Sequence, residues 1–335
     1  MINDVFRMKL KAILVAMACC VALVPVSVLR PQSQQQEQAL PPTAAQLKIS
    51  VNVVNVYAVV RDKKRLVPDL NKGDFELTED NVPQEIKYFA KQTDTPLTLV
   101  LAVDTSPSQE RVLPAEQAAS KQFASEVLRP KDAFAVIHFD VEVELLQDFT
   151  SDLAYLNRAI DETQINGGGG GPMPGTFPTT GGATHLYDAV YLASHDMLAN
   201  ESGRKVIILV TDGEDQGSRL TLDQSLEMAQ KADVIIYSIL LADRGFYMRG
   251  GFGYGGEGVL NKLSSETGGR VIRANNPRNT SEAFEEIANE LRTQYLLGYT
   301  SSNKNNNGAF RRIKVHVTQG NYTVQARRGY YAPSS

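Results

Sequence analysis

Residues 97–108 read L-T-L-V-L-A-V-D-T-S-P-S, and this stretch decides the fold. Its first seven residues are almost continuously apolar, which is typical of a strand that is covered on both faces. The run stops at Asp104, and a polar loop that contains Ser106 and Ser108 follows. Residues 205–210, K-V-I-I-L-V, form a second such run, which stops in the same way at T-D-G. Both runs predict buried strands with polar groups at their carboxyl ends, where open α/β sheets bind ligands.

Further strand-like and helical segments alternate around these two runs. Apolar runs predict additional strands at 133–139, 141–146 and 234–241. Apolar residues at helical spacing predict helices at 113–127, 186–197, 222–232 and 284–291. We therefore expect an α/β domain over residues 96–293, built on a doubly wound, mostly parallel, Rossmann-like sheet.

The segments on either side, 47–95 and 294–335, have a different pattern. Residues 47–60 begin with strict alternation of apolar and polar residues, as in a half-buried strand. Short strand-like runs follow in both segments, and neither segment is long enough to build a robust core alone. We expect the two to pack together as an accessory β-sandwich, with the α/β domain inserted between them.

The N-terminus has the features of an export signal. Basic residues, ending at Lys11, precede an uncharged and mostly apolar run at 12–29. Residues 1–30 are predicted to be a signal peptide that is cleaved, with an uncleaved membrane anchor as the alternative. Residues 31–46, which are rich in Gln, are predicted to form a linker. The expected location is therefore the periplasm, the cell envelope or the extracellular space.

Composition excludes several other classes of protein. The chain has 335 residues, of which 42% are hydrophobic and 21% are charged, so disordered and fibrous classes do not fit. Its formal net charge of −4 gives no global basic field that would favour nucleic acid. Both cysteines, Cys19 and Cys20, lie in the first apolar run, so a mature chain has no disulfide and no thiolate metal site.

Oxygen-bearing side chains gather where predicted strands end and a helix begins. The D-x-S-x-S spacing puts Asp104, Ser106 and Ser108 on one loop, where one carboxylate and two hydroxyls can face the same point. Thr184, at the start of a predicted helix, and Asp212, after the second buried run, can complete a ring. Hard cations such as Mg²⁺ prefer such ligands. The plain structural interpretation is that Ser108 caps a helix and Asp212 begins a turn.

In this combination the middle of the chain resembles the von Willebrand factor type A domain family. The family's metal-ion-dependent adhesion site is matched by five residues, Asp104, Ser106, Ser108, Thr184 and Asp212. The stretches V-P-D-L at 67–70 and A-R-R-G-Y-Y-A-P at 326–333 also look like those of exported acidobacterial VWFA-related proteins.

The resemblance implies which residues contact the ion directly and which act through water molecules. Ser106, Ser108 and Thr184 are the expected direct ligands of Mg²⁺, or of Mn²⁺ or Ca²⁺, while Asp104 and Asp212 orient waters and balance charge. Asp188, one helical turn after Thr184, can support the site or make a plain structural hydrogen bond. A carboxylate from a partner then takes the vacant position on the ion.

We expect an exported, cation-dependent binding module that recognises a protein or peptide through an acidic group, and not an enzyme. One alternative is a metal-dependent hydrolase, but a phosphatase of the haloacid dehalogenase type needs a second aspartate where Ser106 stands. Another alternative is a structural envelope protein without a ligand. No small-molecule cofactor is expected.

Other candidates have plainer interpretations. The Gly run at 167–171 is expected to be a flexible insertion, and the Gly- and Tyr-rich stretch 244–256 a surface loop. A catalytic role for His185 is not expected. Glu214 and Asp215 are expected to face solvent. The pairs Arg311-Arg312 and Arg327-Arg328 are expected on solvated strand faces.

Overall fold

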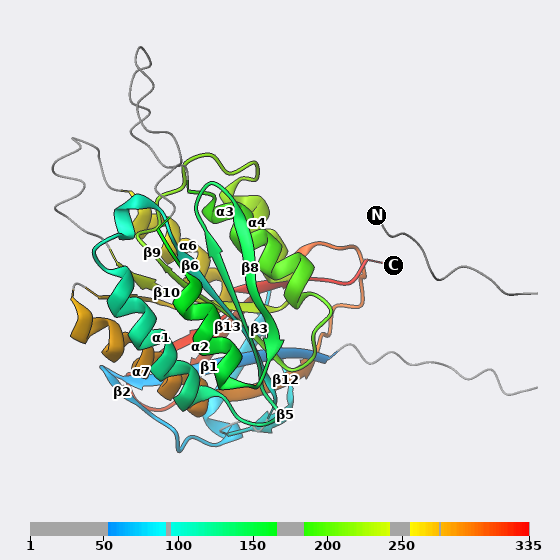
Figure 1. The fold of residues 1–335 in the computed structure, drawn as a ribbon. Coiled ribbons are helices and arrows are strands. Elements are labelled where there is room, and N and C mark those ends of the chain that lie inside the picture. The colour runs from blue at the N-terminus through cyan, green and yellow to red at the C-terminus, as the bar shows by residue number, and fades with distance from the viewer. Residues whose placement is uncertain (1–52, 92–94, 166–183, 242–254, 275, 335) are drawn as a thin grey trace, which may run out of the picture. The chain divides into compact units, whose positions relative to one another are not determined.

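A six-stranded sheet lies at the centre of the fold, in the order β11-β10-β9-β6-β7-β8 (Figure 1). The structure is a computed structural model that describes residues 53–91, 95–165, 184–241, 255–274 and 276–334. The strands of this sheet are β6 (Leu97–Asp104), β7 (Ala133–Phe139), β8 (Val143–Thr150), β9 (Arg204–Thr211), β10 (Val234–Leu240) and β11 (Val271–Arg273). The strands β11, β10, β9, β6 and β7 pair in parallel, and β8 is antiparallel to β7. This confirms the predicted α/β fold with a mixed, mostly parallel sheet.

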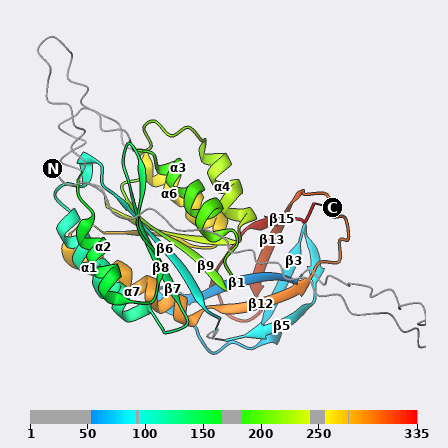
Figure 2. The ribbon, with the colours of Figure 1, turned by 45° about the vertical axis from the view of Figure 1, so that its right-hand side comes forward.

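Helices cover both faces of this sheet, which explains why its central strands are apolar throughout. Figure 2 shows α1, α2 and α7 on one face and α3, α4 and α6 on the other, and each set packs into its own apolar cluster. Every residue of β6 is buried. The helical elements are η2 (Pro107–Gln109), α1 (Leu113–Val127), α2 (Leu153–Glu162), α3 (Leu186–Leu192), the π-helical η3 (Ala193–Leu198), α4 (Leu222–Lys231), α6 (Gly256–Thr267) and α7 (Pro277–Thr293).

Three predicted elements differ from the structure, and one of them is the helix expected at 284–291, which spans Pro277–Thr293. The strand expected at 141–146 is β8, Val143–Thr150, because a turn occupies the residues before it. In that turn the Asp140 amide donates to the Glu142 carbonyl, and the Glu142 amide donates to the Asp140 carboxylate. The helix expected at 186–197 becomes π-helical from Ala193.

Strands from the two flanking segments pair with one another in two antiparallel sheets. One sheet has the order β14-β1-β12-β5, with β2 beside β1, and the other has the order β15-β13-β3-β4. Apolar residues of both sheets form one cluster. The flanking elements are β1 (Val53–Asp62), β2 (Arg65–Leu66), η1 (Lys72–Asp74), β3 (Phe75–Glu79), β4 (Val82–Gln84), β5 (Ile86–Ala90), β12 (Tyr295–Thr300), β13 (Phe310–Val317), β14 (Thr323–Ala326) and β15 (Gly329–Tyr331). The sandwich architecture and the domain boundaries stay predictions.

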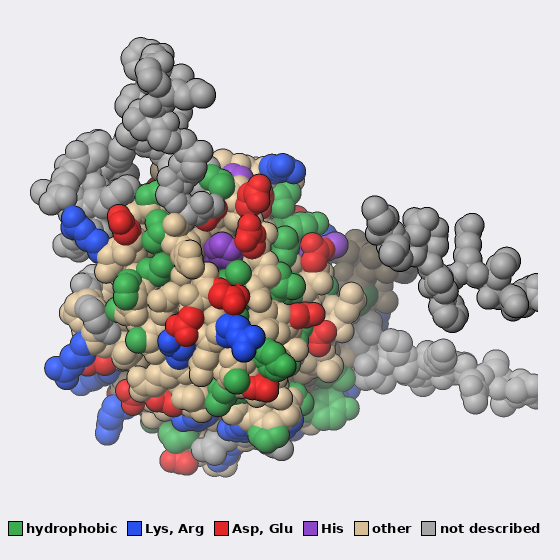
Figure 3. Space-filling view, viewed as in Figure 1, with side chains coloured by type: hydrophobic (Ala, Val, Ile, Leu, Met, Phe, Trp, Pro, Cys, Tyr) green, Lys and Arg blue, Asp and Glu red, His purple; other side chains and the backbone are tan. Residues whose placement is uncertain are grey.

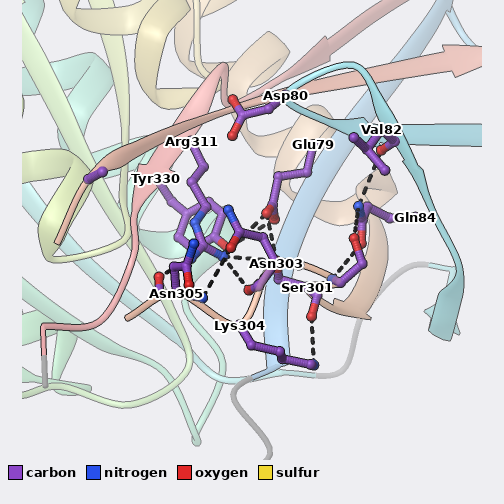
Figure 4. Close-up of polar contacts among 12 residues, drawn as sticks. Glu79, Asp80, Val82, Gln84, Ser301, Asn303, Lys304, Asn305, Arg311 and Tyr330 are labelled. Carbon is purple, nitrogen blue, oxygen red and sulfur yellow. Dashed lines mark hydrogen bonds and ion pairs between the residues drawn. The ribbon is translucent and has the colours of Figure 1, made fainter. Parts of the chain in front are cut away.

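The flank core contains a buried ion pair, which corrects one expectation (Figure 4). Arg311 is only 3% exposed, and its guanidinium lies 3.3 Å from the Glu79 carboxylate. The hydroxyls of Tyr299 and Tyr330 donate to the same carboxylate at 2.7 and 2.9 Å, and that of Ser301 at 2.6 Å.

The expected solvated position is therefore wrong for Arg311, because strand alternation puts it on the inner face with Ile313. It is also wrong for Arg327, which is half-buried and pairs with Asp233. Arg312 and Arg328 are exposed, as expected.

Removing the carboxylate from this pair should destabilise the fold strongly. Glu79→Ala leaves a buried guanidinium uncompensated, which costs about 3–5 kcal/mol of unfolding free energy. Glu76→Ala, an exposed glutamate in the same strand, should change it by less than about 0.5 kcal/mol. Denaturant unfolding of both variants measures the difference, and equal losses would contradict the assignment of Glu79 and Arg311 as a structural pair.

Candidate metal centre

Two predicted site residues meet because the strands that carry them are neighbours. β6 and β9 run in parallel and are paired up to Val103 and Val210, so their carboxyl ends lie side by side. Asp104 is the last residue of β6, and Asp212 follows the last residue of β9. Both are buried, with exposed fractions of 0% and 1%. The topology thus places two carboxyl groups together at one edge of the sheet.

Hydrogen bonds connect four of the five predicted residues. The Asp104 carboxylate accepts from the Ser106 amide at 2.9 Å and from the Thr211 hydroxyl at 2.6 Å. The hydroxyls of Ser106 and Ser108 are 3.0 Å apart, and that of Ser108 donates to Asp212 Oδ2 at 2.7 Å. Ser108 therefore faces the second carboxylate, and Val112, not Ser108, is the residue that precedes the first turn of α1.

The fifth residue, Thr184, pairs through its main chain with Gln216, in the segment that follows Asp212. Its amide donates to the Gln216 carbonyl at 3.0 Å, and the Gln216 amide donates to the Thr184 carbonyl at 2.9 Å. Thr184 is 5% exposed. Its segment therefore lies against the chain that follows Asp212, and a ligand role for its hydroxyl stays a prediction.

The oxygen atoms are spaced suitably for a small cation. Two neighbouring ligands of an octahedral Mg²⁺, each 2.0–2.1 Å from the ion, are about 2.9 Å apart. The hydroxyl oxygens of Ser106 and Ser108, the two direct ligands expected on this loop, are 3.0 Å apart, which is close to that value. Among the described residues no group of three or more His, Cys, Asp or Glu side chains is placed to hold a metal ion. A cation here would therefore need the hydroxyls as ligands.

Electrostatics also favour a positive charge at this place. Burial, and then repulsion from Asp212, raise the pKa of the Asp104 carboxyl to about 7, although hydrogen bonds from Ser106 and Thr211 oppose the shift. Two adjacent carboxylates removed from water are unfavourable unless protons or a cation compensate them. A divalent cation would balance their two negative charges.

Three further residues shape the site, and the sequence analysis did not single them out. The Gln109 side-chain amide donates to Ser108 Oγ at 3.1 Å and to Asp212 Oδ2 at 3.0 Å. Thr211 supports Asp104 as described. Asp140, just after β7, accepts from the Thr105 hydroxyl at 2.8 Å and so holds the first loop. Strand ends carry such residues, so the same rule that found Asp104 could have found Asp140 and Thr211.

The expectation that Glu214 and Asp215 face solvent is wrong, since both are half-buried. Glu214 accepts from the amides of Gly255 and Gly256 at 2.6 and 2.8 Å, where α6 begins. Asp215 accepts from the Tyr187 amide at 3.2 Å in the first turn of α3. Each carboxylate thus takes up free amides at a helix N-terminus.

Gly213, between Asp212 and this pair, has a φ of +84°, and a Cβ there would lie 2.5 Å from the Gly256 carbonyl oxygen. The loop therefore needs glycine at this position.

Asp188 contacts the segment that follows these acidic residues. Its two carboxylate oxygens accept from the amides of Arg219 and Leu220 at 3.1 and 3.0 Å. The main-chain amide of His185 donates to the Asp140 carbonyl at 2.7 Å. The stretch 167–171 and all but the last two residues of 244–256 lie outside the described residues.

Comparison with known proteins finds a family model that matches the part of the chain around this site. Residues 99–214 match the model of the von Willebrand factor type A domain. This part of the chain is similar to that domain, and the match covers about a third of the 335 residues. Domains of this family are typically modules of metal-dependent protein interaction and adhesion. The match spans the first loop, Thr184 and Asp212.

The chain is also similar, at low sequence identity, to several known proteins. An uncharacterized protein of Borreliella burgdorferi is 22% identical over 227 residues, and the chain spans 62% of that relative's length, with 62% of this chain aligned. The solved von Willebrand factor type A structure from Catenulispora acidiphila is 14% identical, with 78% of this chain and 74% of that chain covered and a TM-score of 0.48. Proximal thread matrix protein 1 from the mussel byssus, solved with a zinc-occupied MIDAS motif, is 17% identical, with 64% and 50% covered and a TM-score of 0.49.

The raised pKa of Asp104 predicts that the metal-free protein loses stability as pH rises. Between about pH 4 and pH 7 the folded state keeps a proton on Asp104 that the unfolded chain has released, so this group lowers the free energy of unfolding by at most about 4 kcal/mol. Denaturant unfolding in EDTA at several pH values measures this fall. Asp104→Asn, which cannot titrate, should show a smaller fall, and parallel curves for the two proteins would contradict the prediction.

Proposed function

We propose that this chain is an exported binding module that holds a divalent cation and recognises a protein or peptide ligand through an acidic group. The observation that carries the proposal is the connected set of Ser106, Ser108 and Asp212 oxygens, with Asp104 buried beside them. The VWA family supports a protein-binding role. The cation is Mg²⁺, with Mn²⁺ and Ca²⁺ as other ions of the same class.

The five residues have different tasks in this proposal. Ser106, Ser108 and Thr184 contribute neutral hydroxyl ligands, and Asp104 and Asp212 act mainly through water molecules. The contacts of Asp104 support this division, because both of its oxygens already accept hydrogen bonds from Ser106 and Thr211. An ion with few direct carboxylate ligands keeps enough positive charge to attract a carboxylate from a partner. Asp188 supports the arrangement indirectly, by holding residues 219–220.

Binding agrees better with this site than hydrolysis does. Phosphoryl transfer of the haloacid dehalogenase type needs a general acid two residues after the first aspartate, and that residue is Ser106. Lys and Arg side chains are interspersed with Asp and Glu on the face shown in Figure 3, which therefore offers no broad basic surface for a nucleic acid.

Export is proposed from residues 1–30, which lie outside the described residues. None of the helices in the described residues combines the length and the apolar character that crossing a membrane requires.

Calorimetric titration with Mg²⁺ tests the cation site directly. The wild-type chain should bind one ion, and Asp104→Ala and Asp212→Ala should abolish the heat of binding, because each removes a charge that balances the ion. Asp223→Asn is the matched control, since Asp223 is exposed and pairs with Lys262. Binding by all four proteins alike would contradict the site assignment.

The class of function can be tested by capture from envelope extracts. Immobilised wild-type chain should retain a protein partner in Mg²⁺ and release it in EDTA, and Asp212→Ala should retain nothing. Capture that EDTA does not reverse would contradict cation-dependent recognition. Metal-dependent turnover of a simple phosphate ester would favour the hydrolase alternative instead.

A further inference from the structure

A buried carboxyl group on α1 has no task among the five predicted ligands. Glu116 lies in the first turn of α1 and is 1% exposed. Neither of its carboxyl oxygens has a hydrogen-bond partner among the described residues. Burial, and then the charges of Asp104 and Asp212, raise the pKa of Glu116 well above its usual range. Glu116 is therefore within electrostatic reach of both aspartates of the proposed metal centre.

A charged Glu116 at this position would be very unfavourable. It would be a third carboxylate in a buried place that already holds two, and a divalent ion balances only two charges. The neutral carboxylic acid avoids this cost, and it offers one O–H donor that needs an acceptor. An unpaired buried donor costs about 1–3 kcal/mol, so an acceptor nearby is expected.

Gln109 supplies an acceptor that lacks a donor. Its side chain is fully buried, and its Nε2 donates to Ser108 and Asp212 as described. Its Oε1 has no hydrogen-bond partner among the described residues. A buried donor on Glu116 and a buried acceptor on Gln109 would satisfy one another.

The backbone brings these two side chains to the same side. The Val112 amide donates to the Gln109 carbonyl at 3.0 Å, and the Glu116 amide donates to the Val112 carbonyl at 3.1 Å. These helical hydrogen bonds place Gln109, Val112 and Glu116 on successive helical turns. Because helical side chains tilt toward the N-terminus of their helix, we expect the Glu116 side chain to lie on the side of Gln109.

We propose that Glu116 is a positioning residue of the metal centre. Its carboxylic acid donates to Gln109 Oε1, directly or through one buried water molecule, and thereby fixes the Gln109 amide toward Ser108 and Asp212. The inference rests on the proposed cation site.

A rotated amide would present Oε1, an acceptor, to the Asp212 carboxylate, and the hydrogen bond to Asp212 would be lost. The Ser108 hydroxyl could donate to Oε1 only by giving up its hydrogen bond to Asp212. The donor from Glu116 selects the orientation in which Nε2 faces the site. With Nε2 donating to Ser108 Oγ, the Ser108 hydroxyl proton is left for Asp212.

Substitutions at Glu116 separate this role from a purely structural one. Glu116→Gln keeps a neutral donor and should bind Mg²⁺ with a Kd within about twofold of wild type. Glu116→Leu loses the donor and should weaken Mg²⁺ binding about tenfold, as expected for one buried hydrogen bond. Its metal-free Tm should not fall, because a buried polar group is replaced by an apolar one. Ser120→Ala, one turn further along α1, is the control and should bind as wild type does.

The dependence on Gln109 is tested with a double-mutant cycle in the full chain. Gln109→Leu alone should weaken Mg²⁺ binding, and adding Glu116→Leu should weaken it no further, because both changes remove the same connection. If Glu116→Leu fails to fold, Glu116→Ala replaces it in the cycle.

Three results would overturn the inference while leaving the cation site intact. The first is that Glu116→Leu binds Mg²⁺ as tightly as wild type does. The second is that the losses of Mg²⁺ affinity in the two single variants add up in the double variant. The third is that Glu116→Gln loses as much Mg²⁺ affinity as Glu116→Leu does, which would assign a charged role to Glu116. Absence of Mg²⁺ binding by the wild-type chain would overturn the proposed function itself, together with this inference.

Discussion

Asp104 and Asp212 are buried next to one another at the ends of two neighbouring parallel strands, and most of the surrounding structure compensates for this. Two carboxylates without water around them require donors and positive charge. The donors come from the loop itself, through the Ser106 amide and the hydroxyls of Thr211 and Ser108. A divalent cation would supply positive charge to both groups at once, which is the reason to expect one here.

The rigid sheet is what keeps these groups in place. Helices on both faces prevent the ends of β6 and β9 from separating. Acidic side chains next to the site fix the neighbouring helices instead of the ion: Glu214 accepts from the start of α6, and Asp215 from the start of α3. The site is therefore a small number of oxygen atoms, and the two acidic side chains that follow Asp212 in the sequence already contact main-chain amides.

The sequence allowed the central fold to be predicted because its buried strands are long, apolar and regularly spaced. Asp104, Ser106, Ser108 and Asp212 were predictable for the same reason, as each lies where a recognisable strand stops. Glu116 was not, because a glutamate in the first turn of a helix gives no sign from spacing alone that it is buried. Arg311 was misjudged for a related reason. Its charge suggested a position in solvent. The alternation of side chains along β13 turns it inward instead, where it pairs with Glu79, 232 residues away in the chain.

The pairing of the two flanks has a consequence for how the chain is made. β1 and β3 are synthesised early, yet β1 is completed by β12 and β14, and β3 by β13, only when the last part of the chain exists. During that interval both strands have open edges, which invite pairing with other chains. Contacts so distant in sequence also form slowly. A chain that stops before β12 therefore keeps these edges permanently unpaired, so the flank sheets make correct assembly depend on complete synthesis.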